Sequence, residues 1–279
     1  MIVRSKFIQL ITLSALVVVA TVIAACSSEE EATIEKAEAS GKLVSSDWML
    51  ENLDNEDVVV VDLRKEEDYA AGHIPGAIQL TPKAVFQQED ENGVAGMLPA
   101  AAHIATALSE LGIEPSDTVV FYDSNSNLWA SRALWAMDVY GHSDSKLIDG
   151  SWNYWSANEL KTSTDVPEIT ASSYAFTAAP DLSIIAGWEE VLESVDDPSK
   201  IVCDTRSPEE FSGKDVRAAA GGHIPESSNV NWNRSVNEQG EFLPAAELRV
   251  IYEGEGIQGD KVVFTLCQPA VRATHSWFV

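Results

Sequence analysis

Basic residues are scarce in this chain of 279 residues. Lysine and arginine together number 18 against 44 aspartates and glutamates, which gives a formal net charge of -26 at pH 7. A surface of this charge repels the phosphate backbone of DNA and RNA, so the composition argues against a nucleic-acid partner. It also makes any cluster of arginines conspicuous.

Cysteine and histidine are few as well, with three and five residues. They do not show the spacing of a metal-ligand set, and we expect neither a metal nor another cofactor. Cys203 lies in the run Ile201-Val202-Cys203-Asp204, which predicts a buried strand. We therefore interpret Cys203 as a small core residue rather than a disulfide partner of Cys267.

A long apolar run occurs only near the N-terminus. Arg4 and Lys6 precede a mainly apolar stretch at 7–25, and Cys26 follows two alanines. This pattern resembles a bacterial lipoprotein signal peptide at 1–25, which is cleaved before a lipid-bearing Cys26. We expect an acidic tether at 26–42 and a protein of the cell envelope, facing the periplasm or the exterior, held to the membrane by the lipid anchor only. The alternative is an uncleaved membrane anchor, because the apolar stretch is nearly long enough to span a bilayer.

The remainder of the chain repeats itself. Four landmarks occur twice in the same order, at offsets of 142 to 150 residues. They are the runs 58–64 and 201–206, Gly-His-Ile-Pro at 72–75 and 222–225, Leu-Pro-Ala-Ala at 98–101 and 243–246, and the runs 118–122 and 262–266. The second copy carries an insertion around 213–221. We predict a first domain at 43–160, a linker at 161–183 and a second domain at 184–279.

Each copy has the pattern of an α/β domain. Short, continuous β-branched runs such as 58–61 and 262–266 alternate with helical patterns such as 101–111. Continuous apolar strands are typical of a mainly parallel sheet that helices cover on both faces. Functional residues of such folds gather in the loops that follow the strands, so the candidate site is expected there.

One such loop differs between the copies. The run 262–266 ends at Cys267, four residues follow, and a helix is expected to start near Arg272. Backbone N–H groups, the positive helix end and Arg272 would all lower the pKa of the Cys267 thiol and stabilise an anion. This arrangement predicts Cys267 as a nucleophile that carries a second, anionic sulfur. The first copy has Asp123 at the same place, and a carboxylate cannot do this chemistry.

Together these motifs resemble a known family. Asp204-Thr205-Arg206 with Pro-Glu-Glu-Phe at 208–211, Gly-His-Ile-Pro at 222–225 and the strand–Cys267–loop–Arg272 arrangement resemble the tandem-domain rhodanese family, over residues 43–279. The family comprises thiosulfate and 3-mercaptopyruvate sulfurtransferases. The resemblance implies two rhodanese-like domains, the first non-catalytic. It implies an enzyme that moves sulfur from thiosulfate or 3-mercaptopyruvate, through a Cys267 persulfide, to a thiophilic acceptor such as cyanide or a thiol.

The resemblance also implies a set of substrate-binding residues. Arg206 and Arg272 would contact the small anionic donor, and Arg217 stands where mercaptopyruvate-type members carry a substrate arginine. Gln268 and Val271 belong to the same loop. The alternatives are a strand-end salt bridge for Arg206, as its counterpart Arg64 could form, and a place on the helix surface for Arg272. The paired histidines of the Gly-His-Ile-Pro motifs are expected to pack turns.

Loop length and composition bear on the reaction. Related phosphatases place five residues between cysteine and arginine to wrap a phosphate, whereas four intervene here, which favours sulfur transfer. Gln268 with Arg272 resembles bacterial Cys-Gln-Thr-Gly-Val-Arg loops assigned to thiosulfate, so thiosulfate is favoured over 3-mercaptopyruvate.

The second copy departs from the family pattern in three ways. Pro269 removes a backbone N–H, and Ala270 replaces a glycine in a loop that would need a positive φ. Glu226 replaces the glycine that follows the Gly-His-Ile-Pro motif in the first copy. The counterpart of the closing motif at 149–155 would fall near 293–299, so we expect a second domain that is C-terminally truncated and lacks its last strand. The alternative to an active enzyme is an impaired envelope rhodanese that acts as a binding module or a persulfide carrier.

Overall fold

The computed structural model describes residues 41–279. The predicted signal peptide, Cys26 and nearly all of the tether therefore lie outside the described residues. Between residues 41 and 279, no helix is long and apolar enough to cross a membrane.

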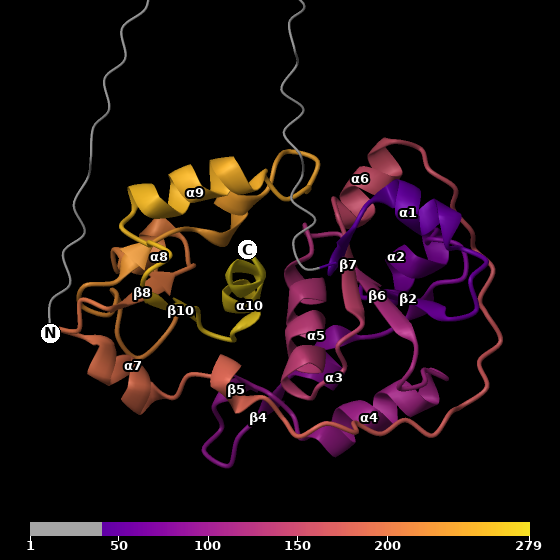
Figure 1. Cartoon of the computed structure of the whole chain (residues 1–279), viewed down its shortest axis with the longest axis horizontal. Helices are drawn as coiled ribbons and strands as arrows, with labels where there is room; N and C mark the ends of the chain where they lie inside the picture. Colours follow the sequence, from indigo (N-terminus) through magenta and orange to yellow (C-terminus); the bar gives the residue numbers. More distant parts are fainter. Residues whose placement is uncertain (1–40) are drawn as a thin grey trace, which may run out of the picture. The chain divides into compact units, whose positions relative to one another are not determined.

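The first repeat is built on a five-stranded parallel sheet in the order β1-β7-β6-β2-β3. The central strands β2 (Val58–Asp62) and β6 (Thr118–Tyr122) are flanked by β3 (Ile78–Gln79) on one side, and by β7 (Ser145–Ile148) and β1 (Leu43–Val44) on the other. Figure 1 shows this sheet in indigo to magenta.

Helices cover this sheet on both faces. Alternate residues of the central strands belong to two separate cores, with Val61 and Phe121 in one and Val60 and Tyr122 in the other. This is the burial expected of continuous apolar strands in a doubly covered sheet. The helices are α1 (Ser46–Glu51), α2 (Glu66–Ala71), α3 (Pro82–Phe86), α4 (Ala101–Glu110), α5 (Leu128–Val139) and α6 (Ser151–Ala157), and a hairpin of β4 (Gln88–Glu89) and β5 (Ala95–Met97) follows α3.

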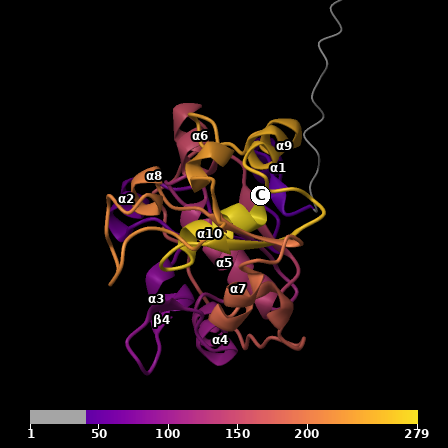
Figure 2. The same cartoon turned by 90° about the vertical axis from the view of Figure 1, so that its left-hand side faces the viewer.

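The second repeat has the same parallel arrangement. Its sheet has the order β10-β8-β9, formed by β10 (Val262–Leu266), β8 (Lys200–Asp204) and β9 (Ser228–Asn229). Two short 3-10 helices, η1 (Leu182–Ile184) and η2 (Trp232–Ser235), accompany α7 (Trp188–Ser194), α8 (Pro208–Phe211), α9 (Ala245–Gly254) and α10 (Val271–Phe278). The prediction of two α/β domains with mainly parallel sheets is confirmed. Helix α10 packs against α5 of the first repeat, and Figure 2 gives a second view of the two helices.

The two sheets differ at one edge. In the first repeat β6 is covered by β7, and Val119 is fully buried. In the second repeat the equivalent strand, β10, is the edge of the sheet within the described residues, and its Val262 and Val263 are 54% and 38% exposed. The second sheet thus has three described strands, with apolar side chains left exposed along its edge strand.

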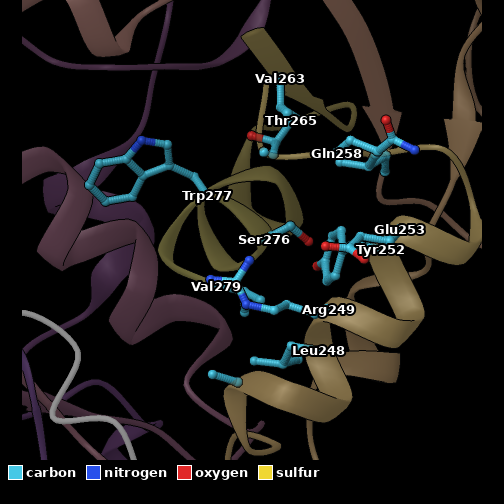
Figure 3. Close-up of a pocket in the computed structure, with 13 residues that line it drawn as sticks. Leu248, Arg249, Tyr252, Glu253, Gln258, Val263, Thr265, Ser276, Trp277 and Val279 are labelled. Carbon is cyan, nitrogen blue, oxygen red and sulfur yellow. The ribbon is translucent and has the colours of Figure 1, made fainter. Parts of the chain in front are cut away.

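A cavity of about 390 Å³ opens beside this edge, between α9, β10 and α10 (Figure 3). Leu248, Tyr252 and Ile257 line it, and Cys267 is not among the lining residues. The three positions correspond to fully buried core residues of the first repeat, Ile104, Leu108 and Ile113. The cavity is therefore a part of the second core that is less densely filled than its counterpart.

Candidate functional site

Cys267 stands between the end of β10 and the start of α10. Strand β10 ends at Leu266 and α10 begins at Val271, so the predicted strand, loop and helix are confirmed. The Sγ atom of Cys267 accepts a hydrogen bond from the N–H of Ala273 at 3.4 Å. Ala270, the residue before the helix, has φ 57° and ψ 12°. The positive φ expected at this non-glycine position is therefore present, and it costs on the order of 1 kcal/mol.

The equivalent loop of the first repeat shows which chemical group its backbone N–H groups bind. The carboxylate of Asp123 accepts hydrogen bonds from four backbone N–H groups, those of Asn125, Asn127, Trp129 and Ala130, at 2.7 to 3.2 Å. Trp129 corresponds to Ala273, whose N–H reaches Cys267. Both loops also turn through a left-handed residue, Ser126 (φ 52°) in the first repeat and Ala270 in the second. The turn of the first repeat thus surrounds its own carboxylate with backbone N–H groups, and the turn of the second repeat has the same backbone course around Cys267.

Cys267 itself is partly buried in this turn. Burial raises the pKa of the Cys267 thiol, whereas the N–H of Ala273 and the charge of Arg272 act in the opposite direction. The prediction of a lowered pKa was therefore wrong in its net direction, because the loss of hydration around the sulfur outweighs the groups that stabilise the thiolate.

Arg272 lies beside Cys267 but has a second partner. Its two terminal nitrogens donate to both carboxylate oxygens of Glu210, at 2.5 and 3.0 Å. The Glu210 side chain is 1% exposed, and the hydrogen bonds from Arg272 hold the pKa of its carboxyl down at about 2. Arg272 also stabilises the Cys267 thiolate. Its positive charge is therefore shared between the sulfur and a buried carboxylate.

Arg206 forms the alternative contact left open by the sequence, a strand-end salt bridge. It donates to both carboxylate oxygens of Asp204, at 2.6 to 3.1 Å, and to the carbonyl of Gly222 at 2.8 Å. Arg64 makes the same bonds to Asp62 and to the carbonyl of the first-repeat glycine at position 72. The hydrogen bonds of Arg206 thus fix the Gly-His-Ile-Pro turn and do not reach the Cys267 loop.

The other candidate residues are distributed differently. Arg217, in the insertion, is 53% exposed and pairs with Asp215 at 2.7 Å and more loosely with Glu210 at 3.9 Å. It therefore stands next to Arg272 across one carboxylate. Gln268 is exposed at the tip of the loop, whereas Val271 is 5% exposed and belongs to the first turn of α10.

The histidines and Cys203 have packing roles, as expected. His73 stacks on Tyr69 and His223 stacks on Phe211, with ring centroids 3.9 and 3.7 Å apart. Cys203 is fully buried and free, and burial raises the pKa of its thiol to about 12. No cluster of His, Cys, Asp and Glu within residues 41–279 could hold a metal ion.

Three residues of the first repeat contribute to the site and were not identified from the sequence. Gln87 donates from Nε2 to the carbonyl of Pro269 at 2.9 Å. The backbone of Gly96 lies so close that a Cβ there would be 2.6 Å from the Pro269 Cα. Arg132 holds the segments that carry both, through the carbonyls of Phe86 at 3.1 Å and Gly96 at 3.0 Å. In the sequence, the signal that could have identified Arg132 was its place as a single arginine within the apolar helix 128–137.

Comparisons with known proteins agree with this geometry. A family model described as a rhodanese-like domain matches residues 45–158 and again residues 188–279. A protein of Saccharopolyspora erythraea, provisionally named a thiosulfate sulfurtransferase, is 35% identical over 246 residues that cover 85% of each chain. The sulfur carrier protein TtuD of Thermus thermophilus is 35% identical over 251 residues, 85% of this chain and 86% of TtuD. The crystal structure of SseA from Escherichia coli, a 3-mercaptopyruvate sulfotransferase, has 27% identity and a TM-score of 0.74, and the match covers 85% of this chain and 92% of SseA.

Proposed function

The chain belongs to the rhodanese family, and from that premise we propose that it is a sulfurtransferase that carries the transferred sulfur on Cys267. The observation that supports this most directly is the pair of equivalent turns. One holds the Asp123 carboxylate on four backbone N–H groups, and the other presents Cys267 at the same position. A turn that binds an anion next to a thiol is suited to a persulfide, whose terminal sulfur is anionic at neutral pH.

The reaction then has two displacement steps. The Cys267 thiol first loses its proton to solvent, and the thiolate attacks the outer sulfur of thiosulfate. The sulfur–sulfur bond of the donor breaks, sulfite leaves with the electron pair, and Cys267 becomes a persulfide. Cyanide or a thiolate next attacks the terminal sulfur, the new bond of the persulfide breaks, and the Cys267 thiolate is regenerated. The turn stabilises the charge in both steps without moving.

Arg217 and Arg272 are the residues that we propose for binding the donor. They flank Glu210, and Arg217 is about half exposed, so it has free surface to offer an anion. Gln268 adds an uncharged polar group at the loop tip. The relative of Saccharopolyspora erythraea supports thiosulfate as the donor, and SseA supports 3-mercaptopyruvate. We favour thiosulfate, because a site for this donor has to bind only the one sulfonate group beside the transferred sulfur. A site for 3-mercaptopyruvate would have to bind a carboxylate at a fixed distance from that sulfur.

Formation of thiocyanate from thiosulfate and cyanide tests the proposal. The wild-type protein should turn over, and Cys267→Ser should fall to the rate without protein. Cys203→Ser is the matched control, because it removes the other described thiol from a buried strand and should retain activity. Equal rates for the wild type and Cys267→Ser would refute the proposal. The same assay with 3-mercaptopyruvate ranks the two donors.

A persulfide carrier is the second candidate function, supported by the similarity to TtuD. A carrier would take sulfur from thiosulfate but release it to cyanide slowly. Mass spectrometry after thiosulfate treatment should then show a gain of one sulfur atom on Cys267 without thiocyanate turnover. Rapid turnover would favour the enzyme.

The cellular location is a separate proposal that rests on the sequence alone. We propose a lipid-anchored envelope protein, with Cys26 as the lipidated residue. Cells fed labelled fatty acid should label the wild-type protein and not a Cys26→Ser variant, and an unlabelled wild-type protein would refute the anchor.

A further inference from the structure

Helix α5 of the first repeat contains a buried cation that no carboxylate neutralises. Arg132 is 1% exposed, and within the described residues its guanidinium forms no ion pair. It lies over the ring of Trp135, with 4.6 Å to the centroid, and donates only to backbone carbonyls. Burial lowers the pKa of Arg132 to about 10, and the ionisable group that opposes this effect is Cys267. An arginine stays charged in such a site, and its charge requires an anion nearby.

Other arginines near the active site are already balanced. Arg272 is held by Glu210, and Arg206 is held by Asp204. Both ion pairs have almost fully buried carboxylates, so much of their positive charge is cancelled before it acts on the sulfur. Arg132 has no carboxylate partner among the described residues, so its charge is not cancelled in this way.

Arg132 is also linked mechanically to the Cys267 loop. The two carbonyls that it binds, those of Phe86 and Gly96, stand at the two ends of the segment that carries the β4–β5 hairpin. That segment contacts the loop twice, through the hydrogen bond from Gln87 to Pro269 and through the backbone of Gly96 against Pro269. Arg132 of the first repeat thereby fixes the segment against which the Cys267 loop of the second repeat packs.

We propose that Arg132 is the counter-ion of the anionic sulfur on Cys267 and the residue that positions the loop from the first repeat. The first repeat then has a role in the reaction. Its own loop carries Asp123 in place of a nucleophile, but its Arg132 supplies positive charge to Cys267, the nucleophile of the second repeat. The thiolate part of this inference is independent of the proposed function, and the persulfide part rests on it.

Alkylation of Cys267 tests the charge without requiring sulfur transfer. Iodoacetate is anionic and iodoacetamide is neutral, so the ratio of their rates measures the positive charge at the sulfur. The rates are measured at one pH on the whole protein for Arg132→Lys and Arg132→Gln. Both variants keep a hydrogen-bond donor for the carbonyls, but only Arg132→Lys keeps the charge. Arg64→Gln is the matched control, because Arg64 is a buried arginine of the same repeat that Asp62 already neutralises.

The expected result is a fall in the iodoacetate to iodoacetamide ratio of about threefold or more in Arg132→Gln, a ratio close to wild type in Arg132→Lys, and no fall in Arg64→Gln. An unchanged ratio in Arg132→Gln would overturn the inference. An equal fall in both Arg132 variants would overturn the counter-ion claim and leave a positioning role only. If Arg132→Gln does not fold, the ratio in Arg132→Lys against that in Arg132→His at pH 8.5, where a histidine is neutral, decides the question in the same way. Because both reagents react with the free thiol, the outcome is independent of whether the protein transfers sulfur.

Discussion

Glu210 accepts two hydrogen bonds from Arg272, at 2.5 and 3.0 Å, next to a cysteine whose thiolate Arg272 also stabilises. The carboxylate therefore competes with the sulfur for the same guanidinium. Burial raises the pKa of Cys267 above its ordinary value, and Arg272, which opposes this effect, is shared with Glu210.

Replacing Glu210 with glutamine should release the charge of Arg272. Glutamine keeps an oxygen that can accept from Arg272 but removes the negative charge, so the pKa of Cys267 should fall. The rate of alkylation by iodoacetamide at pH 7 should rise severalfold, by about three times or more. Glu209→Gln, at the exposed neighbouring position on the same helix, makes the same change in net charge and should leave the rate unaltered. Equal rates in the two variants would show that Glu210 does not restrain Arg272.

The contact between Gly96 and Pro269 predicts that the first repeat controls the loop. Gly96→Ala would place a Cβ 2.6 Å from the Pro269 Cα, so the loop must shift. Misplacing a reacting atom by about 1 Å can lower a rate about a hundredfold, so thiocyanate formation should fall by about ten- to a hundredfold. Gly93→Ala is the matched control in the same hairpin. Gly93 also has a positive φ but nothing within 4 Å, so that variant shares the strain and not the collision. Equal losses would trace the effect to hairpin strain alone.

Glu226 should be a source of instability in the second repeat. It has φ 64° at the place where the first repeat has Gly76 at φ 79°. A left-handed conformation costs a residue with a Cβ about 1–2 kcal/mol, and the greater freedom of glycine in the unfolded chain offsets part of the gain. Glu226→Gly should therefore raise the free energy of unfolding by up to about 1 kcal/mol, measured by urea denaturation. Glu226→Ala keeps the strain and should raise the free energy of unfolding by much less. An equal gain in both variants would mean that removing the negative charge, and not relieving the backbone strain, stabilises the protein.

The sequence predicted the features that depend on local pattern. A β-branched run followed by a helical pattern placed Cys267 between β10 and α10, and the continuous apolar runs in both copies predicted the two parallel sheets. The positive φ of Ala270 could also be predicted from the sequence, because a tight turn between a strand and a helix leaves few other conformations.

Contacts between distant segments could not be predicted in this way. Glu210 and Arg272 lie on α8 and α10, and Arg132 is linked to the Cys267 loop through the hairpin that packs on it. For Arg206 the sequence left two roles open, because an arginine two residues after a strand-end aspartate can turn back to that aspartate or forward to a ligand. The net pKa of Cys267 was predicted with the wrong sign, since burial is a property of the packed domain and not of the loop.

His275 should make stability depend on pH in the mildly acidic range. It is fully buried between Phe242 and Trp232, with both ring centroids 5.0 Å away, and its Nε2 lies 3.1 Å from the carbonyl of Ser126 in the first repeat. Burial lowers the pKa of His275 to about 4 from an ordinary value of 6.5. Between these two values the unfolded chain binds a proton that the folded chain excludes, so stability is fully present above pH 6.5 and is lost as the pH falls towards 4.

A His275→Phe variant removes this titration while keeping a ring of similar size in the same stack. It gives up the hydrogen bond to Ser126, at a cost of about 1 kcal/mol at neutral pH. The urea midpoint of the wild type should fall between pH 6.5 and 4.5 more steeply than that of His275→Phe, so the two curves should converge in acid. His103→Gln, at an exposed position on α4, should follow the wild type throughout. Parallel curves for the wild type and His275→Phe would mean that another group governs the loss of stability in acid. Convergence would show that the cost of protonating this buried imidazole accounts for the loss of stability in acid.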